Sequence, residues 1–359
     1  MYRLQKGLSL VELMVAMVVG LILIAGVGKI FVDSKKTYSF QQSLARIQEN
    51  GRMALEFLGR DIRMAGYTGC ASGDYSSTTN TLNNAATINY DFSRGVRGYD
   101  VGASVPTDLS ALSPAPLPNT DVLILKGPVG DGVKVVQNNN SAQLFAEEKG
   151  VEAGACADST DRISGICQGD ILMVADCNKA RIFQTGNIQV TGQPNEFNLT
   201  HPASGTPGNA ISSWGGASAP DSEKFGTDSE IIKMNTVYYY IATSAGGSGQ
   251  PALWQAIVPG TAQEILEGVE NLQLLYGRDT GTDFVPDQYD TATAVTSAAA
   301  WDKVGAVRVQ LLVRSVENNV TDTAQVVSFN GGSVNSVAPT DKRLRHVFVS
   351  TIGVRAKMP

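Results

Sequence analysis

Ser9 and Glu12 are the first residues whose types and spacing suggest chemistry. They interrupt a run from Leu8 to Val32 that is otherwise apolar apart from Lys29. The spacing S-x-x-E is that of a capping box, in which the glutamate satisfies the N-terminus of its own helix. An unpaired carboxylate in lipid would cost about 2.5–3.5 kcal/mol. Glu12 is therefore a helix cap, a group that seeks a cation, or both in different states.

The four cysteines all follow the apolar run, at Cys70, Cys156, Cys167 and Cys177. None forms a C-x-x-C pair and only two histidines accompany them, so a zinc site is poorly supported and no metal or cofactor is predicted. Their even number indicates two disulfides in an oxidising compartment. The alternative is four reduced, buried thiols.

One cysteine pairing is physically disfavoured. Residues 169–177 have the composition of a buried strand, which would hold Cys167 and Cys177 roughly 25–30 Å apart at about 3.3 Å per residue. A disulfide needs Cα atoms within about 7 Å of each other. The pairs Cys156–Cys167 and Cys70–Cys177 are therefore favoured.

The sequence contains no catalytic constellation. Nucleophilic catalysis would need Ser or Cys beside a His and an acid, yet His201 lies in a Gly- and Pro-rich region and His346 in a predicted terminal strand. The G-x-S-x-G and H-E-x-x-H motifs and a phosphate-binding glycine loop are missing. Asp279 and Asp283 lack the carboxylate density of a calcium loop. The chain is not expected to be an enzyme.

Composition narrows the class of protein further. The chain has 359 residues, of which 43% are hydrophobic and only 17% charged, and 37 are glycine. This is typical of a large folded body with many turns. The net charge of −6 becomes more negative if Arg3 and Lys6 are removed. A nucleic acid partner is not expected, because phosphate binding needs clustered lysine and arginine.

The apolar run is long enough to cross a membrane. Its 25 residues would span about 37 Å as a helix, against a hydrocarbon core of about 30 Å. Arg3 and Lys6 precede it, which predicts a cytoplasmic N-terminus and an extracytoplasmic body. The small-residue cleavage site of a conventional secretory signal does not follow.

Beyond the span the helical pattern continues without a break. Apolar and small residues recur every three or four positions as one stripe: Phe40, Leu44, Ile47, Gly51, Leu55, Leu58, Ile62 and Ala65. We predict a single helix from Ser9 to about Ala65, ended by Gly66 as a C-cap glycine. Its first half would lie in lipid, and its second half would pack on the body.

The rest of the chain is predicted to be rich in strands. Residues 71–120 are expected to be loops and short strands, and residues 201–230, 279–300 and 317–342 to be surface excursions. Tyr238, Tyr239 and Tyr240 are expected to alternate between the two faces of one strand. The fold class is α+β, a long helix packed on a large antiparallel β-rich domain. The predicted strands are 121–126, 133–137, 171–177, 180–184, 231–242, 252–258, 269–277, 304–315 and 346–356.

The string KGLSLVELMVAM at residues 6–17 resembles the class III leader of type IV pilins and pseudopilins. In that family a membrane peptidase cuts after the glycine and methylates the new N-terminus. The resemblance implies cleavage between Gly7 and Leu8, N-methylation of Leu8, and pairing of Glu12 with a neighbouring subunit's N-terminus to set assembly register. Leu8 departs from the usual phenylalanine.

The resemblance and the hydropathy pattern together imply four segments. They are a cleaved leader at 1–7, a membrane-spanning and polymerising half-helix at 8–32, an amphipathic half-helix at 33–67, and a β-rich extracytoplasmic domain at 68–359. The leader peptidase and the lipid of the inner membrane would be the first partners.

The body resembles the PilW-type minor pilins. The strings that carry this resemblance are QENGRMALEFLGRDIRMAGY, GDILMVADC, EGVENLQLLYG, VGAVRVQLLVRS and RLRHVFVSTIGVRAK. It implies a low-copy subunit that joins other minor pilins and the major pilin, primes fibre assembly with the inner-membrane machinery, and caps the tip beneath an adhesin. Twitching motility, surface attachment and a final place in the extracellular fibre of a Gram-negative bacterium are implied with it.

Two other functions remain open from the sequence. A minor pseudopilin of type II secretion, similar to the J-type subunit, would share the leader and Glu12. A membrane-tethered periplasmic hydrolase is the alternative from another class, and it would have to use His201 or His346.

Overall fold

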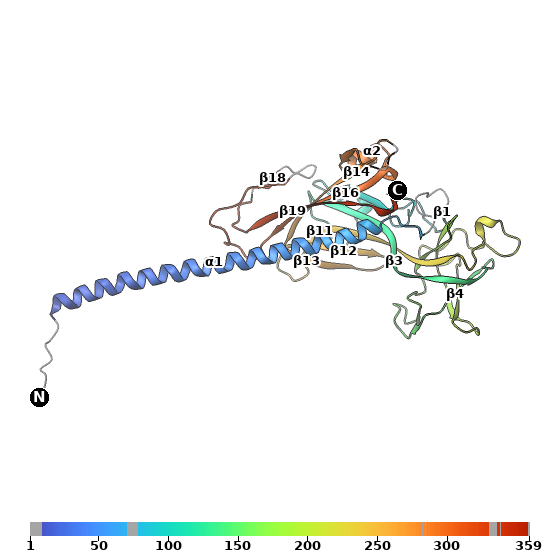
Figure 1. Ribbon diagram of the computed structural model, residues 1–359, viewed down its shortest axis with the longest axis horizontal. Helices are drawn as coiled ribbons and strands as arrows, with labels where there is room; N and C mark the ends of the chain where they lie inside the picture. Colours follow the sequence, from blue (N-terminus) through green and yellow to red (C-terminus); the bar gives the residue numbers. More distant parts are fainter. Residues whose placement is uncertain are drawn as a thin grey trace, which may run out of the picture.

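The computed structural model describes residues 9–69, 78–281, 283, 285–329, 336–337 and 339–357. A single long helix, α1 (Leu10–Met64), projects from a β-rich body, and its N-terminal end lies far from that body (Figure 1). Its 55 residues correspond to a length of about 80 Å. The α+β class predicted from the sequence is confirmed.

The bounds of α1 lie within a residue of those predicted. Ser9 is the N-cap residue and Ala65 the C-cap residue. Gly66 follows with a φ of 73°, a left-handed conformation that glycine adopts without strain. Its N–H donates to the Lys126 carbonyl oxygen at 2.7 Å, so the end of the helix is attached to the sheet.

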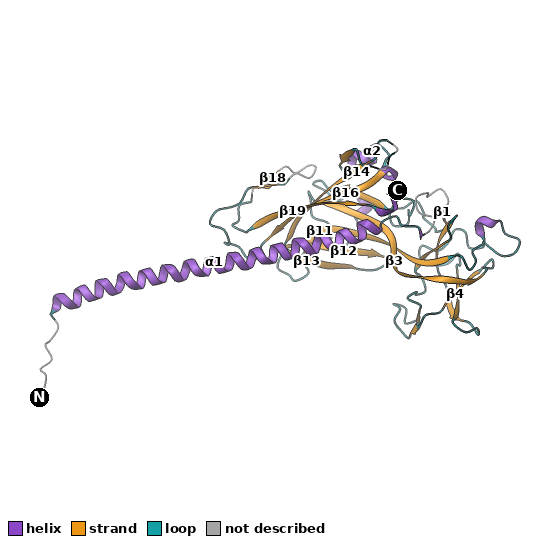
Figure 2. Cartoon of the chain, in the orientation of Figure 1, coloured by secondary structure: helices purple, strands orange, loops and turns teal. Residues whose placement is uncertain are grey.

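The body consists of strands joined by short helical turns (Figure 2). The first half holds β1 (Thr78–Asn80), β2 (Val96–Asp100), β3 (Asp121–Gln137), β4 (Gln143–Glu147), β5 (Val151–Glu152), β6 (Arg162–Ile163), β7 (Ile171–Ala175), β8 (Ala180–Gln184), β9 (Ile188–Val190) and β10 (Glu196–Thr200). The second half holds β11 (Glu230–Thr243), β12 (Pro251–Val258), β13 (Ala262–Glu267), β14 (Val269–Arg278), β15 (Gln288–Asp290), β16 (Val304–Arg314), β17 (Val327–Ser328), β18 (Ser336–Val337) and β19 (Arg345–Gly353). The helical turns are α2 (Ala292–Ser297), η3 (Thr107–Leu109), η4 (Asp221–Glu223), η5 (Trp301–Lys303) and η6 (Arg355–Lys357).

Two sheets dominate the described part of the body. The larger runs in the order β1-β8-β7-β11-β3-β4-β10-β9, with β2 beside β3 and with β12 and β13 beside β11. The smaller has the order β15-β14-β16-β19. Neighbouring strands are antiparallel except β1 and β8, which pair in parallel. The second half of α1 packs on β16 and β19 and reaches β3.

The long strands β3 and β11 divide the body into two parts. Their proximal ends lie beside α1 and the smaller sheet, in a core that includes Leu58, Tyr239 and Leu311. Their distal ends carry β4 to β10 and residues 201–229, which form a second core around Phe183 and Trp214. We call this second part the distal lobe. It lies at the opposite end of the molecule from the N-terminus (Figure 1).

Several sequence predictions need correction. Residues 201–230 are not a bare surface excursion, because His201, Trp214 and Phe225 are buried in or against the distal core. Residues 279–300 contain β15 and α2, and residues 317–342 contain β17 and β18. Isolated aromatic residues among Gly and Ser have no periodicity that a sequence pattern could detect.

The strands predicted at 121–126 and 133–137 form one continuous strand, β3. Gly127, Pro128 and Gly130 suggested a break, but the partner strand β11 absorbs the irregularity through a register shift between Ile231 and Lys233. A β-bulge of this kind bends a strand without ending it. Tyr238, Tyr239 and Tyr240 alternate in facing as predicted, and all three are buried because both faces of β11 are covered.

Candidate assembly surface

The N-terminus of α1 has a complete capping box. The Ser9 backbone N–H donates to Glu12 Oε2 at 3.0 Å, and the Glu12 backbone N–H donates to Ser9 Oγ at 3.2 Å. Both interactions are exposed, so this chain alone offers the carboxylate no burial. Gly7 and Leu8, the predicted cleavage site, lie outside the described residues. Cleavage, methylation and the register role of Glu12 stay predictions.

The first half of α1 is an exposed apolar rod. Every large side chain from Leu10 to Val32 is more than half solvent-exposed or close to it, for example Ile24 at 71%. By length and composition α1 is a helix that could cross a membrane, and the most apolar part of it has no burial within the chain. Such a surface is not stable in water and needs lipid or other helices to cover it.

The second half of α1 is covered by the body. The buried side of this half consists of Ser43, Ile47, Gly51, Ala54, Leu58, Gly59 and Ile62. The predicted stripe is therefore confirmed from Ile47 to Ile62, but Phe40, at its N-terminal end, is exposed. Ser43, Ala54 and Gly59 were missed because small and polar residues carry little weight in an apolar pattern.

Gly51 sets how closely the helix approaches the smaller sheet. A Cβ at this position would lie 2.3 Å from Phe348 Cε2, far inside contact distance. Gly20, Gly26 and Gly28, in the first half, have no atom within 4 Å of such a Cβ. Glycine is therefore required for docking in one half of α1 and meets no steric demand of this chain in the other.

Two ion pairs join α1 to the loop that follows β16. Arg46 Nη1 lies 2.8 Å from Glu317 Oε1, and Lys36 Nζ lies 3.5 Å from Asp322 Oδ1. These side chains are about half exposed or more, so each pair stabilises by only about 0–1 kcal/mol. They fix where the loop lies along α1 and add little to stability.

A buried charge network fixes the base of that loop. Arg345 Nε lies 2.6 Å from Glu270 Oε2, and Arg345 Nη1 lies 2.6 Å from Asp341 Oδ1. Arg314 Nη1 also lies 3.0 Å from Glu270 Oε1. The hydrogen bonds from Arg345 hold the pKa of Asp341 below its usual value. Breaking a buried pair of this kind typically costs about 3–5 kcal/mol. The base of the loop is therefore firmly attached to the smaller sheet.

The C-terminal end of α1 borders a cavity of about 440 Å³ against β3 and β11. Here Tyr239 donates its hydroxyl to Asp61 Oδ2 at 2.6 Å, and Gln255 Nε2 donates to the Tyr239 hydroxyl at 2.6 Å. Burial and the neighbouring Asp61 raise the pKa of Tyr239. Lys126, also at this junction, is buried without an acceptor for its ammonium, and burial lowers its pKa to about 8. Sequence reasoning missed these residues, since a lysine at the end of an apolar run gives no sign of burial.

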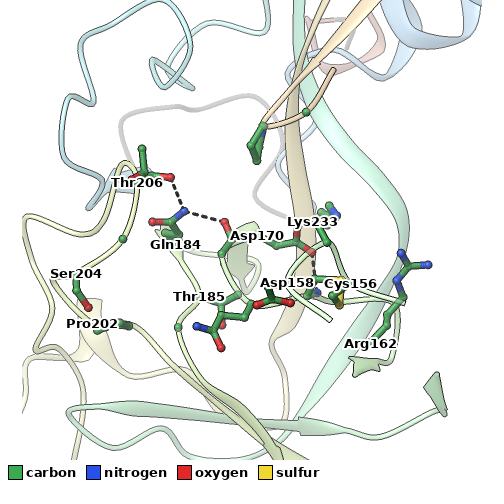
Figure 3. A pocket seen from close by; sticks show the side chains of 18 of the residues that line it. Cys156, Asp158, Arg162, Asp170, Gln184, Thr185, Pro202, Ser204, Thr206 and Lys233 are labelled. Carbon is green, nitrogen blue, oxygen red and sulfur yellow. Dashed lines mark hydrogen bonds and ion pairs between the residues drawn. A yellow bond between two sulfur atoms is a disulfide. The ribbon is translucent and has the colours of Figure 1, made fainter. Parts of the chain in front are cut away.

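A cavity of about 710 Å³ lies in the distal lobe (Figure 3). Three of its polar side chains, Lys233, Asp170 and Gln184, are paired within the chain. Lys233 Nζ lies 2.8 Å from Asp170 Oδ1, and Gln184 Nε2 donates at 2.8 Å to the carbonyl oxygens of Gly169 and Thr206. A cavity whose polar groups are satisfied in this way has little affinity left to offer a polar ligand.

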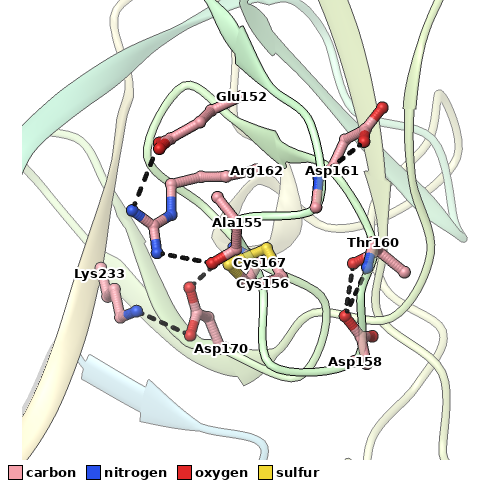
Figure 4. Close-up of a disulfide and its surroundings, with 11 residues drawn as sticks. Glu152, Ala155, Cys156, Asp158, Thr160, Asp161, Arg162, Cys167, Asp170 and Lys233 are labelled. Carbon is pink, nitrogen blue, oxygen red and sulfur yellow. Dashed lines mark hydrogen bonds and ion pairs between the residues drawn. A yellow bond between two sulfur atoms is a disulfide. The ribbon is translucent and has the colours of Figure 1, made fainter.

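The Cys156–Cys167 disulfide borders this cavity, as the sequence favours (Figure 4). Its Cα atoms are 5.6 Å apart. The Cys167 backbone N–H donates to Asp170 Oδ2 at 2.9 Å, which links the closed loop to the Lys233–Asp170 pair. Cys177 is disulfide-bonded as well. Cys70, its predicted partner, lies outside the described residues, so that pairing stays a prediction.

The two histidines lie in different parts of the body, and each ring packs against an aromatic neighbour. His201 is 1% exposed and stacks on Trp214 with ring centroids 4.2 Å apart. Burial lowers its pKa to about 4, so it is neutral near pH 7. His346 lies in the smaller sheet against Phe348. In the described part of the chain no group of three His, Cys, Asp or Glu side chains could hold a metal ion.

Comparison with known protein families gives two matches, one at each end of the chain. The prokaryotic N-terminal methylation motif matches residues 2–28, and the family of type IV pilus-assembly protein W matches residues 238–356. The predicted resemblance to PilW-type proteins is confirmed. The PilW match begins within β11 and includes β12 to β19, among them β16 and β19, the strands that α1 contacts most. Strands β4 to β10 of the distal lobe lie outside both matches.

A search of curated proteins found no match to the chain. Among solved structures, the chain is similar to a type IV-like pilin from Thermus thermophilus at 15% sequence identity. That similarity covers 54% of this chain and 86% of the other, with a TM-score of 0.23. So low a score carries no argument about the fold, which is described from the helix and sheets above.

Proposed function

We propose that this PilW-type chain is a minor pilin of the type IV pilus. The observation that carries the proposal is the contrast within α1, where a capped, fully exposed apolar half continues without a break into a half docked on the body. A helix of this kind can be held in lipid first and transferred later into a bundle of similar helices. An assembly subunit needs this property and a soluble enzyme does not.

The proposed processing follows from the N-terminal match. Prepilin peptidase removes residues 1–7, and Leu8 becomes the methylated N-terminus. Residues 8–32 then anchor the chain in the inner membrane, residues 33–67 dock on the body, and the β-rich domain from 68 onward lies in the periplasm. After assembly the subunit is part of the extracellular fibre of a Gram-negative bacterium.

The proposed partners are other minor pilins, the major pilin and the inner-membrane assembly machinery. The chain joins a minor-pilin complex that primes fibre assembly and sits at the fibre tip. Its distal lobe faces away from the membrane, and an adhesin lies above the complex. The position of the distal lobe, at the end of the molecule opposite the N-terminus, supports this orientation (Figure 1). Twitching motility and adhesion depend on that complex. The proposed role is structural and includes no catalytic activity.

Processing is tested by the intact mass and N-terminal sequence of the protein recovered from membranes, with and without prepilin peptidase. Loss of residues 1–7 and a methylated Leu8, only when the peptidase is present, is the expected result. An uncut N-terminus, or a cut after Gly28, would contradict the proposal.

The assembly system is tested by deletion of the gene and complementation. Lost twitching with normal exoprotein secretion supports the pilus. Normal twitching with lost secretion would instead assign the chain to type II secretion as a pseudopilin. A chain lacking residues 1–33 should also show no hydrolase activity, and turnover that is lost on His201→Ala or His346→Ala would contradict the assembly role.

A further inference from the structure

A groove of about 590 Å³ separates α1 from the loop after β16. On the helix side it is lined by Phe31, Val32 and Phe40, and on the loop side by Val320. Lys35 and Lys36 also line it. Thr37, Ser39, Asn319 and Asp322, whose carboxylate pairs with Lys36, complete the lining. The groove therefore has apolar side chains on both sides, two cationic groups and one anionic group, so its net charge is positive.

The groove lies where the apolar half of α1 ends. From Leu10 to Val32 the helix rises about 34 Å, slightly more than a hydrocarbon core of about 30 Å. The headgroup layer beyond it is roughly 5–8 Å thick, about four residues of helix. If α1 spans the membrane, Phe31 and Val32 lie at the edge of the hydrocarbon and Lys35 and Lys36 lie among the headgroups. The Lys36–Asp322 pair then places the loop at the same level.

We propose that this groove binds a phospholipid of the membrane that α1 crosses, with its acyl chain against the apolar walls and an anionic headgroup on Lys35 and Lys36. The proposal rests on the proposed membrane anchoring of α1. Charge complementarity selects the headgroup, because a phosphate accepts from ammonium groups as a carboxylate does. The loop would sit on the outer face of the bilayer and hold the body at a fixed height above it.

The lysines can make this contact without disturbing the fold. The side chains of Lys36 and Asp322 are 67% and 92% exposed, and their separation of 3.5 Å makes a weak pair that can exchange for phosphate. Lys35 is exposed and has no ion-pair partner among the described residues. Two lysines at an anionic surface together give roughly a tenfold or greater preference for contact.

The experiment uses the full chain reconstituted in vesicles of phosphatidylcholine, alone or mixed with phosphatidylglycerol. A nitroxide is attached to A324C, two residues beyond Asp322, under non-reducing conditions that keep the native disulfides. Its collisions with a neutral nickel chelate in the water and with oxygen in the lipid are compared. A217C, in an exposed position of the distal lobe, is the matched control.

We expect nickel collisions at position 324 to fall several-fold when phosphatidylglycerol is added, and those at position 217 to stay unchanged. The double variant K35Q/K36Q should abolish the fall. K134Q/K224Q, which removes two lysines near the distal lobe, should leave it intact. Each of these four substitutions removes one positive charge from a side chain that is not in the core.

Equal nickel collisions at positions 324 and 217 in both lipids would overturn the proposal. So would a fall at position 324 that survives K35Q/K36Q. If nickel collisions at position 324 fell with rising protein density and did not depend on lipid charge, a second copy of the chain would occupy the groove. That result would also overturn the proposal. A nitroxide at A16C, within the apolar half of α1, tests membrane anchoring separately from lipid binding in the groove. If position 16 is open to nickel, the membrane anchoring fails, whereas a protected position 16 with an open position 324 contradicts the lipid groove alone.

Discussion

The two halves of α1 share one helix geometry and differ in what covers them. From Leu10 to Val32 the side chains are exposed and nearly all apolar, whereas from Ser43 to Ile62 one face is buried against β16 and β19. The first half is uniformly apolar around its circumference and the second is apolar on one side. A helix that is apolar on all sides is typical of one surrounded by lipid or by other helices. A helix with one apolar stripe is typical of one that packs on a protein body along that stripe.

The difference explains why the first half cannot be understood from this chain alone. Its cover comes from lipid or from other subunits, so its glycines and its carboxylate have no use within the body. The second half, by contrast, has its partners in the structure, down to the close approach at Gly51. Substitutions in the two halves should therefore have effects of different kinds.

The largest effect is expected at Glu12. Glu12→Gln keeps an oxygen that can complete the capping box but removes the charge. If the charge pairs with a neighbour's N-terminus in an apolar bundle, its loss leaves that ammonium group unpaired, and an unpaired charge in lipid costs about 2.5–3.5 kcal/mol. Recovery of the subunit in sheared fibres should fall at least tenfold.

Ser9→Ala is the matched control, because it removes the other half of the capping box and leaves the charge. It should cost only about 1 kcal/mol of local helix stability and leave recovery close to normal. If S9A were as damaging as E12Q, the carboxylate would act as a cap and the register role would be wrong.

Acid should weaken the distal lobe and spare the docked half of α1. His201 has a pKa of about 4 in the fold against 6.5 when unfolded, because burial disfavours its charged form. Stability is therefore complete above pH 6.5 and falls as the pH drops toward 4, by at most about 3 kcal/mol. The charged groups beside it are Arg181 and Glu223, which pair with each other at 3.8 Å.

The measurement is the unfolding free energy followed by tryptophan fluorescence between pH 7 and pH 4. His201→Phe keeps a ring to stack on Trp214 and cannot titrate, so its stability should fall less over the same range. Identical pH profiles for this variant and the wild-type chain would mean that another group causes the acid sensitivity.

Gly→Ala should change stability in opposite directions in the two halves. At Gly51 the new methyl group collides with Phe348, and such overpacking typically costs about 1–3 kcal/mol. At Gly26 nothing lies within 4 Å, so the higher helix propensity of alanine should stabilise by up to about 1 kcal/mol. Thermal unfolding of the two variants in detergent measures the difference.

Phe348→Leu combined with Gly51→Ala should recover part of the loss at Gly51, since the smaller side chain relieves the collision. If both Gly51→Ala and Gly26→Ala destabilised the chain, the proposed difference between the two halves of α1 would be wrong. A Gly26→Ala variant that folds normally but fails to enter fibres would sharpen it, by showing that a neighbouring subunit packs on that side.

The smallest effect is expected at the ion pairs that join α1 to the loop. Arg46→Gln removes an exposed pair with Glu317 and should change the unfolding free energy by less than about 1 kcal/mol. Added salt should have no larger effect on the variant than on the wild-type chain. A loss of several kcal/mol would mean that this loop, and not the apolar face, holds the second half of α1.

Much of this protein is determined by local sequence. The capped start at Ser9, the apolar half, the stripe from Ile47 to Ile62 and the end before Gly66 all follow from signals within a few residues. Strands such as Ala180–Gln184 and Val304–Arg314 were predicted within one residue of their bounds. Their alternation or continuous apolarity reflects burial directly, so the pattern is sufficient. The favoured Cys156–Cys167 pair followed from the short loop that it closes and from the predicted strand that separates Cys167 from Cys177.

Only the tertiary structure decided which residues meet from distant parts of the chain. Trp214 and Phe225 are isolated in a polar segment, yet they complete the distal core. Gly51 became a contact point through Phe348, almost 300 residues later, and Lys35 and Lys36 became part of a groove through Val320. These relations depend on the path of β3, β11 and β16 through space. A single sequence contains periodicity but not that path, because contacts between remote residues leave no local trace in either partner.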